Sequence, residues 1–303
     1  MPAEIHSSTF KLADAILFDR VPQPWELPEH AFEGSPIPSM ICPQERRFLH
    51  YLTRYCYRGA GAVVDLGPLF GSSTDALLSG MSSGCVHSYD LWQFFPDWER
   101  LLGKSLPVGS DIYPLFKENL ARFGDRVVPH KGDLLQCGWS GASIEILFID
   151  AAKSPDLMLH IANDFFPSLI PGAFVIQQDW VSSGTPWIQI AMGLLADFFE
   201  VMDSPNGGTV CFRVKRQIPP GALAPGYFTD PRAGECLDEA ASFLSARYGL
   251  CVRLGEAHYW AVRGDWQRAM VIWKLVQGHR EYVPEFHGFD VAHVGELLGP
   301  KPL

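Results

Sequence analysis

The chain has 303 residues, 47% of them hydrophobic and 19% charged, which is the composition of a folded globular protein rather than a disordered one. Its formal net charge of −10 argues against nucleic acid as a partner, because a phosphate backbone attracts basic surfaces. No membrane partner is expected, since no apolar run reaches about 18 residues, and seven scattered cysteines without a CxxC pair favour the reducing cytoplasm.

Residues 1–42 are rich in proline and aromatic residues without a clear period, which predicts an arm or lid. A helix is expected over 43–57, where apolar residues recur at helical spacing. From residue 62 onward, short apolar runs alternate with helical segments, and this order predicts a parallel sheet covered on both faces. Strands are expected at 62–66, 85–90, 126–132, 144–150, 173–179 and 209–214, and helices at 73–81, 112–123, 156–168 and 186–199.

Two segments near the end of this region predict an antiparallel hairpin. Residues 199–202 and the strand at 209–214 are expected to pair across Asn206, Gly207 and Gly208, because such residues favour a tight turn. A linker rich in proline and glycine begins near residue 216, and two helical stretches follow it.

These elements predict an α/β fold with a Rossmann-like, doubly wound and mostly parallel seven-stranded sheet that ends in a C-terminal antiparallel hairpin. The expected domains are an N-terminal arm or lid over 1–42, a ligand-binding domain over 43–215 and a C-terminal helical extension over 216–303. The tryptophan-rich part of the extension is expected to form core or the face of a homodimer.

The first predicted strand runs into VVDLGPLFGSST, residues 63–74, in which an acid precedes two glycines four residues apart. Ligands in parallel sheets bind beyond the carboxyl ends of the strands, and glycine lets backbone approach a ligand closely. The third glycine of the phosphate-binding GxGxxG pattern is missing, so a pyrophosphate site is not supported. Asp65 suits a ligand that carries positive charge; alternatively, Asp65 and Gly67 only cap the next helix and shape its turn.

The next two strands also end in acids. Asp90 closes the second strand, and its carboxylate is able to accept both hydroxyls of a ribose. Asp133 follows the third strand, where an adenine amino group could be recognised. An aromatic segment after Asp90 is expected either to stack on adenine, to cover a planar acceptor or to pack in the core, and it comprises Trp92, Phe94, Phe95 and Trp98.

These motifs together resemble those of the class I S-adenosylmethionine-dependent methyltransferases over roughly residues 43–215. VVDLGPLFGSST matches their glycine loop, SYD their ribose-binding acid and KGD the acid that flanks adenine. Their cofactor carries a sulfonium charge and no phosphate, which agrees with an acidic pocket. The resemblance implies that the cofactor contacts Asp65, Gly67, Gly71, Ser73, Thr74, Asp90, Leu91, Trp92, Asp133, Leu134 and Asp150.

FIDAAK, residues 148–153, resembles the corresponding segment of the cation-dependent O-methyltransferases of the catechol and caffeoyl-coenzyme A type. This resemblance implies that Asp150 binds Mg²⁺ or another divalent cation and that Lys153 deprotonates the acceptor hydroxyl. Gln178 and Asp179 stand where an acid and an amide are expected, so the order is reversed and the amide is the weaker ligand. Macrocin-type sugar O-methyltransferases are similar in this region, usually with two consecutive acids where Gln178 and Asp179 stand in this chain.

Without a metal, the proton of the acceptor hydroxyl must pass to Lys153 or to a histidine, for which His130 is the candidate. A lysine acts as a base only where its pKa is depressed. The alternative is that Lys153 pairs with Asp156 on a solvated surface, and that His130 is a core histidine.

The expected function is S-adenosylmethionine-dependent O-methylation of a small-molecule hydroxyl, on a sugar, a phenol or a secondary metabolite. Two alternatives stay open. One is a non-catalytic Rossmann-like binding protein, and the other is an NAD-dependent oxidoreductase, which would share Asp90 as its ribose acid but needs the missing third glycine.

Overall fold

The structure, a computed structural model, describes residues 32, 36–204, 208–242, 244, 246–279 and 294–299. Most of the predicted N-terminal arm lies outside these residues, as do the predicted turn residues Asn206 and Gly207. None of the described helices is long and apolar enough to cross a membrane.

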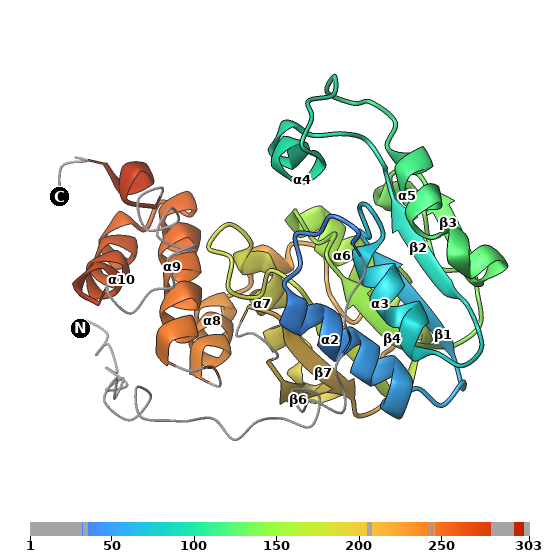
Figure 1. Ribbon diagram of the computed structural model, residues 1–303. Coiled ribbons are helices and arrows are strands. Elements are labelled where there is room, and N and C mark those ends of the chain that lie inside the picture. The colour runs from blue at the N-terminus through green and yellow to red at the C-terminus, as the bar shows by residue number, and fades with distance from the viewer. Residues whose placement is uncertain are drawn as a thin grey trace.

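One seven-stranded sheet forms the centre of the molecule, in the order β3-β2-β1-β4-β5-β7-β6 (Figure 1). The strands from β3 to β5 are parallel to their neighbours, whereas β7 runs antiparallel to both β5 and β6. The strands are β1 (Ala62–Leu66), β2 (Val86–Asp90), β3 (Val127–Lys131), β4 (Ile144–Ile149), β5 (Leu169–Gln177), β6 (Phe199–Asp203) and β7 (Val210–Val214). The predicted fold class is therefore confirmed, including its antiparallel hairpin.

The order of the strands reverses at β1. The chain first builds β2 and β3 on one side of β1 and then places β4 and β5 on the other side. Leu66 at the end of β1 is level with Tyr89 on β2 and with Ile149 at the end of β4. Since ligands of such sheets bind where the order reverses, the segments after Leu66 and Ile149 flank the expected crevice.

The helices cover both faces of this sheet and extend beyond it. They are α2 (Pro43–Tyr51), α3 (Ser72–Gly80), α4 (Glu99–Leu102), α5 (Tyr113–Asn119), α6 (Pro155–Asp164), α7 (Pro186–Leu194), α8 (Ala233–Ser242), α9 (Ala246–Val262) and α10 (Trp266–Gly278). A π-helical turn at Leu52–Cys56 continues α2, and short 3₁₀ turns lie at Pro96–Trp98, Ala121–Arg126, Leu134–Gln136, Phe166–Ser168, Ala196–Phe198 and Tyr227–Thr229.

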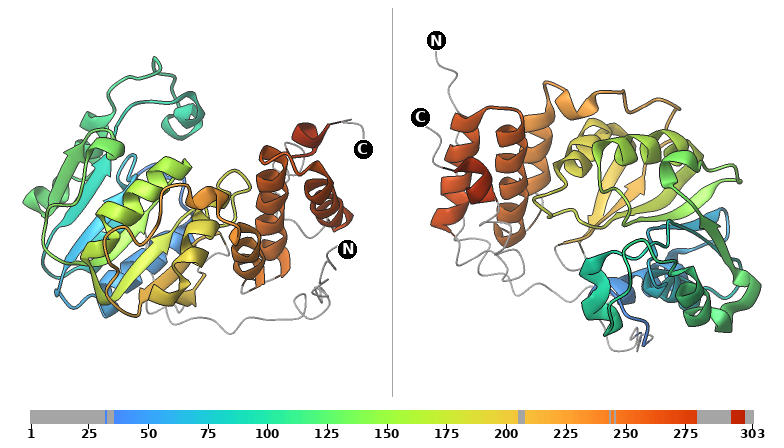
Figure 2. Two further views of the ribbon diagram at one scale, coloured as in Figure 1. Left: turned by 180° about the vertical axis from the view of Figure 1, so that it is seen from behind. Right: turned by 90° about the horizontal axis from the view of Figure 1, so that it is seen from above.

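Alternate residues of the central strands contribute to two separate cores. Val63 and Ile146 pack with α2 and α3 on one face, whereas Val64 and Leu147 pack with α6 and α7 on the other (Figures 1 and 2). Successive side chains of a strand point to opposite faces, so a sheet covered twice needs apolar residues at both positions. This explains the continuous apolar runs in the sequence.

The C-terminal helices continue the core on the side of α7. α8 packs on α7, α9 on α8 and α10 on α9, and they stand together beside the sheet (Figure 2). Buried residues of these helices belong to the same apolar cluster as β4 and β5. The predicted helical extension is thus present in the described residues, and its boundary at residue 216 stays a prediction.

We expect Gly193→Ala to loosen the contact between α7 and α8. A Cβ atom at residue 193 would lie 2.6 Å from Cβ of Cys236 and 2.8 Å from its Sγ, so α8 must shift. Overpacking of this kind costs about 1–3 kcal/mol, and urea denaturation should show a lower midpoint. The matched control is Gly278→Ala at the end of α10, where a Cβ meets nothing within 4 Å. Equal midpoints for wild type and Gly193→Ala would contradict this packing.

Candidate active site

The acid of the first strand is part of the protein core. Asp65 is fully buried, and its Oδ2 accepts hydrogen bonds from Ser73 Oγ at 2.8 Å and Thr74 Oγ1 at 2.6 Å. Thr74 Oγ1 also lies 3.0 Å from Ser88 Oγ, so the group ties together β1, α3 and β2. The predicted cofactor contacts of Asp65, Ser73 and Thr74 stay predictions, and the hydrogen bonds that these side chains form are to one another and to Ser88. They hold the loop, which is the alternative that the sequence left open.

Burial has a clear electrostatic effect on Asp65. Desolvation raises the pKa of its carboxyl group to about 7, although the hydroxyls of Thr74 and Ser73 lower it and the charge of Asp90 raises it slightly. Charge on this carboxyl is costly because no water solvates it.

The two glycines of the β1 loop let other parts of the protein pack closely against the loop backbone. Gly67 has φ of +90°, and a Cβ there would lie 3.0 Å from the carbonyl carbon and oxygen of Asp150. Gly71 has φ of +97°, and its Cβ would lie 2.9 Å from Leu120 Cδ1 and 3.2 Å from Phe116 Cδ2. The predicted role of Gly71 in cofactor contact is thus replaced by helix packing, and the β1 loop lies directly against the end of β4.

Asp90 is the acid that both the backbone and a ligand are able to reach. Its Oδ2 accepts a hydrogen bond from Leu69 N at 3.0 Å, and its Oδ1 accepts one from Trp92 N at 2.6 Å. Leu69 and Trp92 both have positive φ, 53° and 48°, a strained conformation that is common at functional sites. Burial raises the pKa of Asp90, which the backbone hydrogen bonds partly oppose. Each oxygen keeps a second lone pair, so the carboxylate is fixed and still able to accept from a ribose.

The aromatic segment after β2 mainly forms core. Trp92 is fully buried, donates a hydrogen bond from Nε1 to Leu69 O at 2.9 Å and packs against Phe116. Phe94 is also fully buried, whereas Phe95 is exposed. The ring of Trp92 therefore packs inside the protein and hydrogen-bonds to the β1 loop, and its predicted cofactor contact stays a prediction.

Two leucines at the ends of β2 and β3 offer exposed apolar surface instead. Leu91 is 39% exposed and Leu135 is 45% exposed. Leu134, which was predicted to contact the cofactor, is buried, so Leu135 takes its place as the candidate. Asp133 is the N-cap of the short turn Leu134–Gln136, and its Oδ1 accepts a hydrogen bond from Leu135 N at 3.0 Å. The sequence signal for Leu135 was only that it follows Leu134 as a second leucine. The 3₁₀ turn then decides that Leu134 is buried and Leu135 is exposed.

A lysine bridges two acids at the ends of β4 and β5. Lys153 Nζ donates a hydrogen bond to Asp150 Oδ1 at 2.6 Å and another to Asp179 Oδ2. Lys153 is the last residue before the N-cap of α6, where Ser154 accepts from Leu157 N and Pro155 begins the helix. Lys153 therefore pairs across the site with acids from two strand ends, and the predicted surface pair with Asp156 is wrong.

Lys153 does not have the properties of a base. Burial by itself would lower its pKa, but the charges of Asp150 and Asp179 and their hydrogen bonds raise the pKa well above its usual value. Burial also raises the pKa of Asp150, to about 7, against the lowering effect of Lys153. The two carboxylates therefore favour the ammonium form of Lys153, which has no lone pair to offer, and proton abstraction by Lys153 stays a prediction that this pairing does not support.

The residues as arranged do not fit the divalent cation that the resemblance implies. The ammonium of Lys153 lies between the carboxylates of Asp150 and Asp179, where a bridging metal would bind. The amide oxygen of Gln178 is buried and has no hydrogen-bond partner among the described residues. Within those residues, no group of three or more His, Cys, Asp or Glu side chains is arranged to hold a metal ion.

His130 lies away from this cluster. Its ring stacks on Tyr89 with 4.1 Å between ring centroids, and its Nε2 lies 3.1 Å from Nδ1 of His87. β3, which carries His130, is three strand spacings from β4, or about 14 Å. The structure therefore does not bring His130 together with Asp150, and its predicted role as a base stays a prediction.

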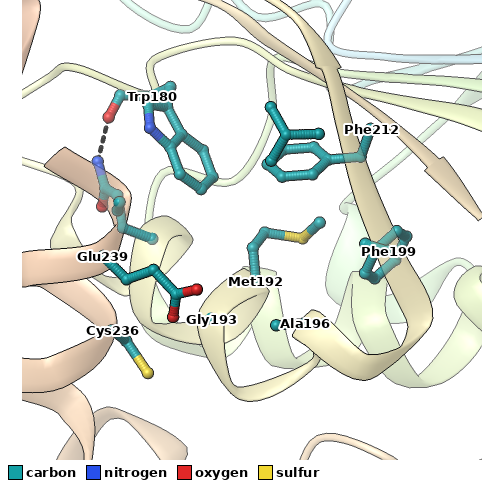
Figure 3. A pocket seen from close by; sticks show the side chains of 11 residues that line it. Trp180, Met192, Gly193, Ala196, Phe199, Phe212, Cys236 and Glu239 are labelled. Carbon is teal, nitrogen blue, oxygen red and sulfur yellow. Dashed lines mark hydrogen bonds between the residues drawn. The ribbon is translucent and has the colours of Figure 1, made fainter. Parts of the chain in front are cut away.

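A pocket lies elsewhere, between α7, the β6–β7 hairpin and α8 (Figure 3). Trp180, Met192 and Phe212 form apolar walls, and Cys236 and Glu239 reach it from α8. Burial raises the pKa of the Cys236 thiol to about 11, so it is not a nucleophile at neutral pH. This cavity belongs to the docking of the extension and does not coincide with the crevice at the strand ends.

Comparisons with known proteins give similarity in structure only. No protein-family model matches the chain, and no curated protein matches it. Among solved structures, the O-methyltransferase NovP is 14% identical, with 59% of this chain and 83% of NovP covered and a TM-score of 0.48. The SAH-bound methyltransferase PaMTH1 of Podospora anserina is 14% identical, with 58% and 80% covered and a TM-score of 0.43. An O-methyltransferase from Bacillus cereus in complex with SAH is 20% identical, with 59% and 84% covered and a TM-score of 0.45.

Proposed function

We propose that the protein is an S-adenosylmethionine-dependent O-methyltransferase that methylates a hydroxyl group of a small molecule. The observation that supports this most is the close contact between Gly67 and the backbone of Asp150, at the point where the strand order reverses. A ligand above the β1 loop would lie beside the cluster of Asp150, Lys153 and Asp179. A methyl donor and its acceptor need this kind of adjacency.

The strand ends fit a nucleoside that carries positive sulfur and no phosphate. Asp90 is held by two backbone N–H groups, and its remaining lone pairs suit the two ribose hydroxyls. Leu91 and Leu135 provide exposed apolar surface for the faces of an adenine ring, and Asp133, whose Oδ1 accepts from Leu135 N, is the candidate for its amino group. Asp65 and Thr74 act from beneath by keeping the loop in place.

When bound, S-adenosylmethionine would supply an electrophilic methyl group for the acceptor oxygen, with sulfur as the leaving group that would keep the electron pair of the carbon–sulfur bond. The acceptor hydroxyl must lose its proton, and a carboxylate oxygen of Asp150 or Asp179 is placed to accept it. Lys153 donates a hydrogen bond to the acceptor oxygen and orients it. Holding two reactants in line contributes roughly 7–11 kcal/mol in favourable cases, which makes orientation the main task of the protein.

We propose that the acceptor is a sugar, a phenol or a secondary metabolite. The proposed location of the protein is the cytoplasm. The seven cysteines all lie in the described part of the chain and form no disulfide there, which supports a reducing compartment. An NAD-dependent oxidoreductase is less well supported, because β7 runs antiparallel beside β5 and the loop lacks the third glycine.

Titration calorimetry with S-adenosylmethionine, S-adenosylhomocysteine and NADH tests the proposal on the full chain. We expect the first two to bind in the micromolar range and NADH not to bind. Transfer of a labelled methyl group to a panel of hydroxyl compounds then separates an enzyme from a binding protein. Binding of NADH in place of S-adenosylmethionine would contradict the proposal and support the oxidoreductase.

A further inference from the structure

We propose that the ammonium group of Lys153 is a built-in replacement for a divalent cation in the acceptor site, so that the acceptor oxygen binds to Lys153 and methyl transfer requires no metal. The part of this inference that concerns the acceptor depends on the proposed function. The part that concerns metal binding does not depend on it.

The geometry of the bridge carries the inference. Lys153 Nζ lies 2.6 Å from Asp150 Oδ1 and also contacts Asp179 Oδ2. Asp150 follows β4 and Asp179 follows β5, two adjacent parallel strands, so the two carboxylates converge from neighbouring strand ends. A metal ion bridging these carboxylates would have to occupy the same space as the ammonium.

The backbone around the bridge is held in place on both sides. Asp179 has φ of 61°, a strained conformation for a residue other than glycine. Its carbonyl oxygen accepts hydrogen bonds from Thr185 Oγ1 and Ser182 N, both at 3.0 Å. On the other side, Trp187 Nε1 donates to Ala152 O at 2.7 Å, next to Lys153. Hydrogen bonds therefore hold the backbone at Asp179 and at Ala152, which precedes Lys153.

The charges and ligands also favour lysine over a metal. A divalent cation beside Lys153 would meet a like charge a few ångströms away, and this repulsion weakens binding. The third ligand that a metal would need from this chain is Gln178, but its amide oxygen is buried below the surface. A neutral amide is also a weaker partner than a carboxylate for a hard cation.

The ammonium keeps one hydrogen-bond donor for a ligand. It has three N–H groups, and two of them serve Asp150 and Asp179. The side chain of Lys153 is 52% exposed, so the remaining donor is open to an incoming molecule. An acceptor hydroxyl bound there would accept from Lys153 and donate to a neighbouring carboxylate.

Binding of Mn²⁺ alone, measured by electron paramagnetic resonance on the full chain, tests this without any substrate. We expect Lys153→Met to bind Mn²⁺ at least 10-fold more tightly than the wild type, because it frees both carboxylates. Lys153→Arg keeps the cation and should bind as weakly as the wild type. Lys117→Met, which removes an ammonium that lies over the Tyr113 ring on α5, is the matched control and should change nothing.

Equal Mn²⁺ affinity of wild type and Lys153→Met would overturn the proposal, and so would tight stoichiometric binding by the wild type. If Lys153→Met does not fold, the wild-type titration decides by itself, since weak binding supports the proposal and tight binding overturns it. In the methyl-transfer assay, the wild type should keep its full rate in a chelator, and a rate restored only by Mg²⁺ would count against the inference. Calorimetry with S-adenosylmethionine on the same sample shows separately whether the proposed function fails.

Discussion

Asp90→Ala is expected to remove measurable binding of S-adenosylmethionine, a loss of at least about 100-fold in affinity. Two charge-assisted hydrogen bonds from ribose hydroxyls are lost, each worth about 1.5–3 kcal/mol, and 1.4 kcal/mol corresponds to a factor of ten. The same carboxylate also accepts from Leu69 N and Trp92 N, so its removal frees the strained loop that faces the ligand. Titration calorimetry of variant and wild type measures the effect.

The control for Asp90→Ala is Asp197→Ala, which removes a carboxylate that is 89% exposed and pairs with Arg216 at 3.6 Å. It should leave the affinity unchanged. Asp90→Asn is a second variant that keeps the size of the side chain, and thermal melting shows whether either variant is folded. A folded Asp90 variant that binds S-adenosylmethionine as tightly as the wild type would refute the assigned ribose contact.

Asp65→Asn is expected to make the protein more stable at pH 8, by up to about 4 kcal/mol, and to have little effect near pH 4. The folded-state pKa of Asp65 is raised by burial to about 7, from an ordinary value of 3.8. The folded protein therefore holds this proton more tightly than the unfolded chain, and stability is lost as pH rises from about 4 to 7. Three pKa units at about 1.4 kcal/mol each give the upper limit.

Asparagine at residue 65 avoids this loss because it is neutral at every pH, and its oxygen still accepts from Ser73 and Thr74. Urea unfolding at several pH values measures the difference between variant and wild type, so other groups that titrate in both proteins cancel. The difference should grow between about pH 4 and pH 7. A difference that is constant over this range would mean that Asp65 is already charged in the folded protein at low pH.

The positions of the strands and their order along the chain could be predicted from short-range features of the sequence. Each apolar run lies between an acid or glycine turn and a helical segment, and β1, β2 and β4 lie within a residue of the predicted bounds. Helix ends were less accurate. The predicted helix over 43–57 ends at Tyr51 and continues as a π-helical turn, and the one over 112–123 ends at Asn119 and continues as a 3₁₀ turn. These ends depend on packing against neighbouring elements, which a local pattern does not contain.

The acids at the strand ends show the limit of a sequence pattern. Both Asp65 and Asp90 lie near the ends of their strands, yet Asp65 is level with Ser88 inside the sheet and fully buried, whereas Asp90 is the last residue of β2 and only partly buried. Leu134 and Leu135 differ in the same way, because one short turn directs the first inward and the second outward. Whether a side chain meets a ligand depends on what packs over it.

By itself, the sequence determined the mostly parallel sheet, the order of strands and helices along the chain, and the acids near the strand ends, because apolar runs and turns are local properties. Only the tertiary structure decided the order of the strands within the sheet, and that Lys153 lies between Asp150 and Asp179, whose charges raise its pKa. The physical reason is that the pKa of a group is set by every charge and by the burial around it, and Asp179 comes from another strand end, distant in the chain.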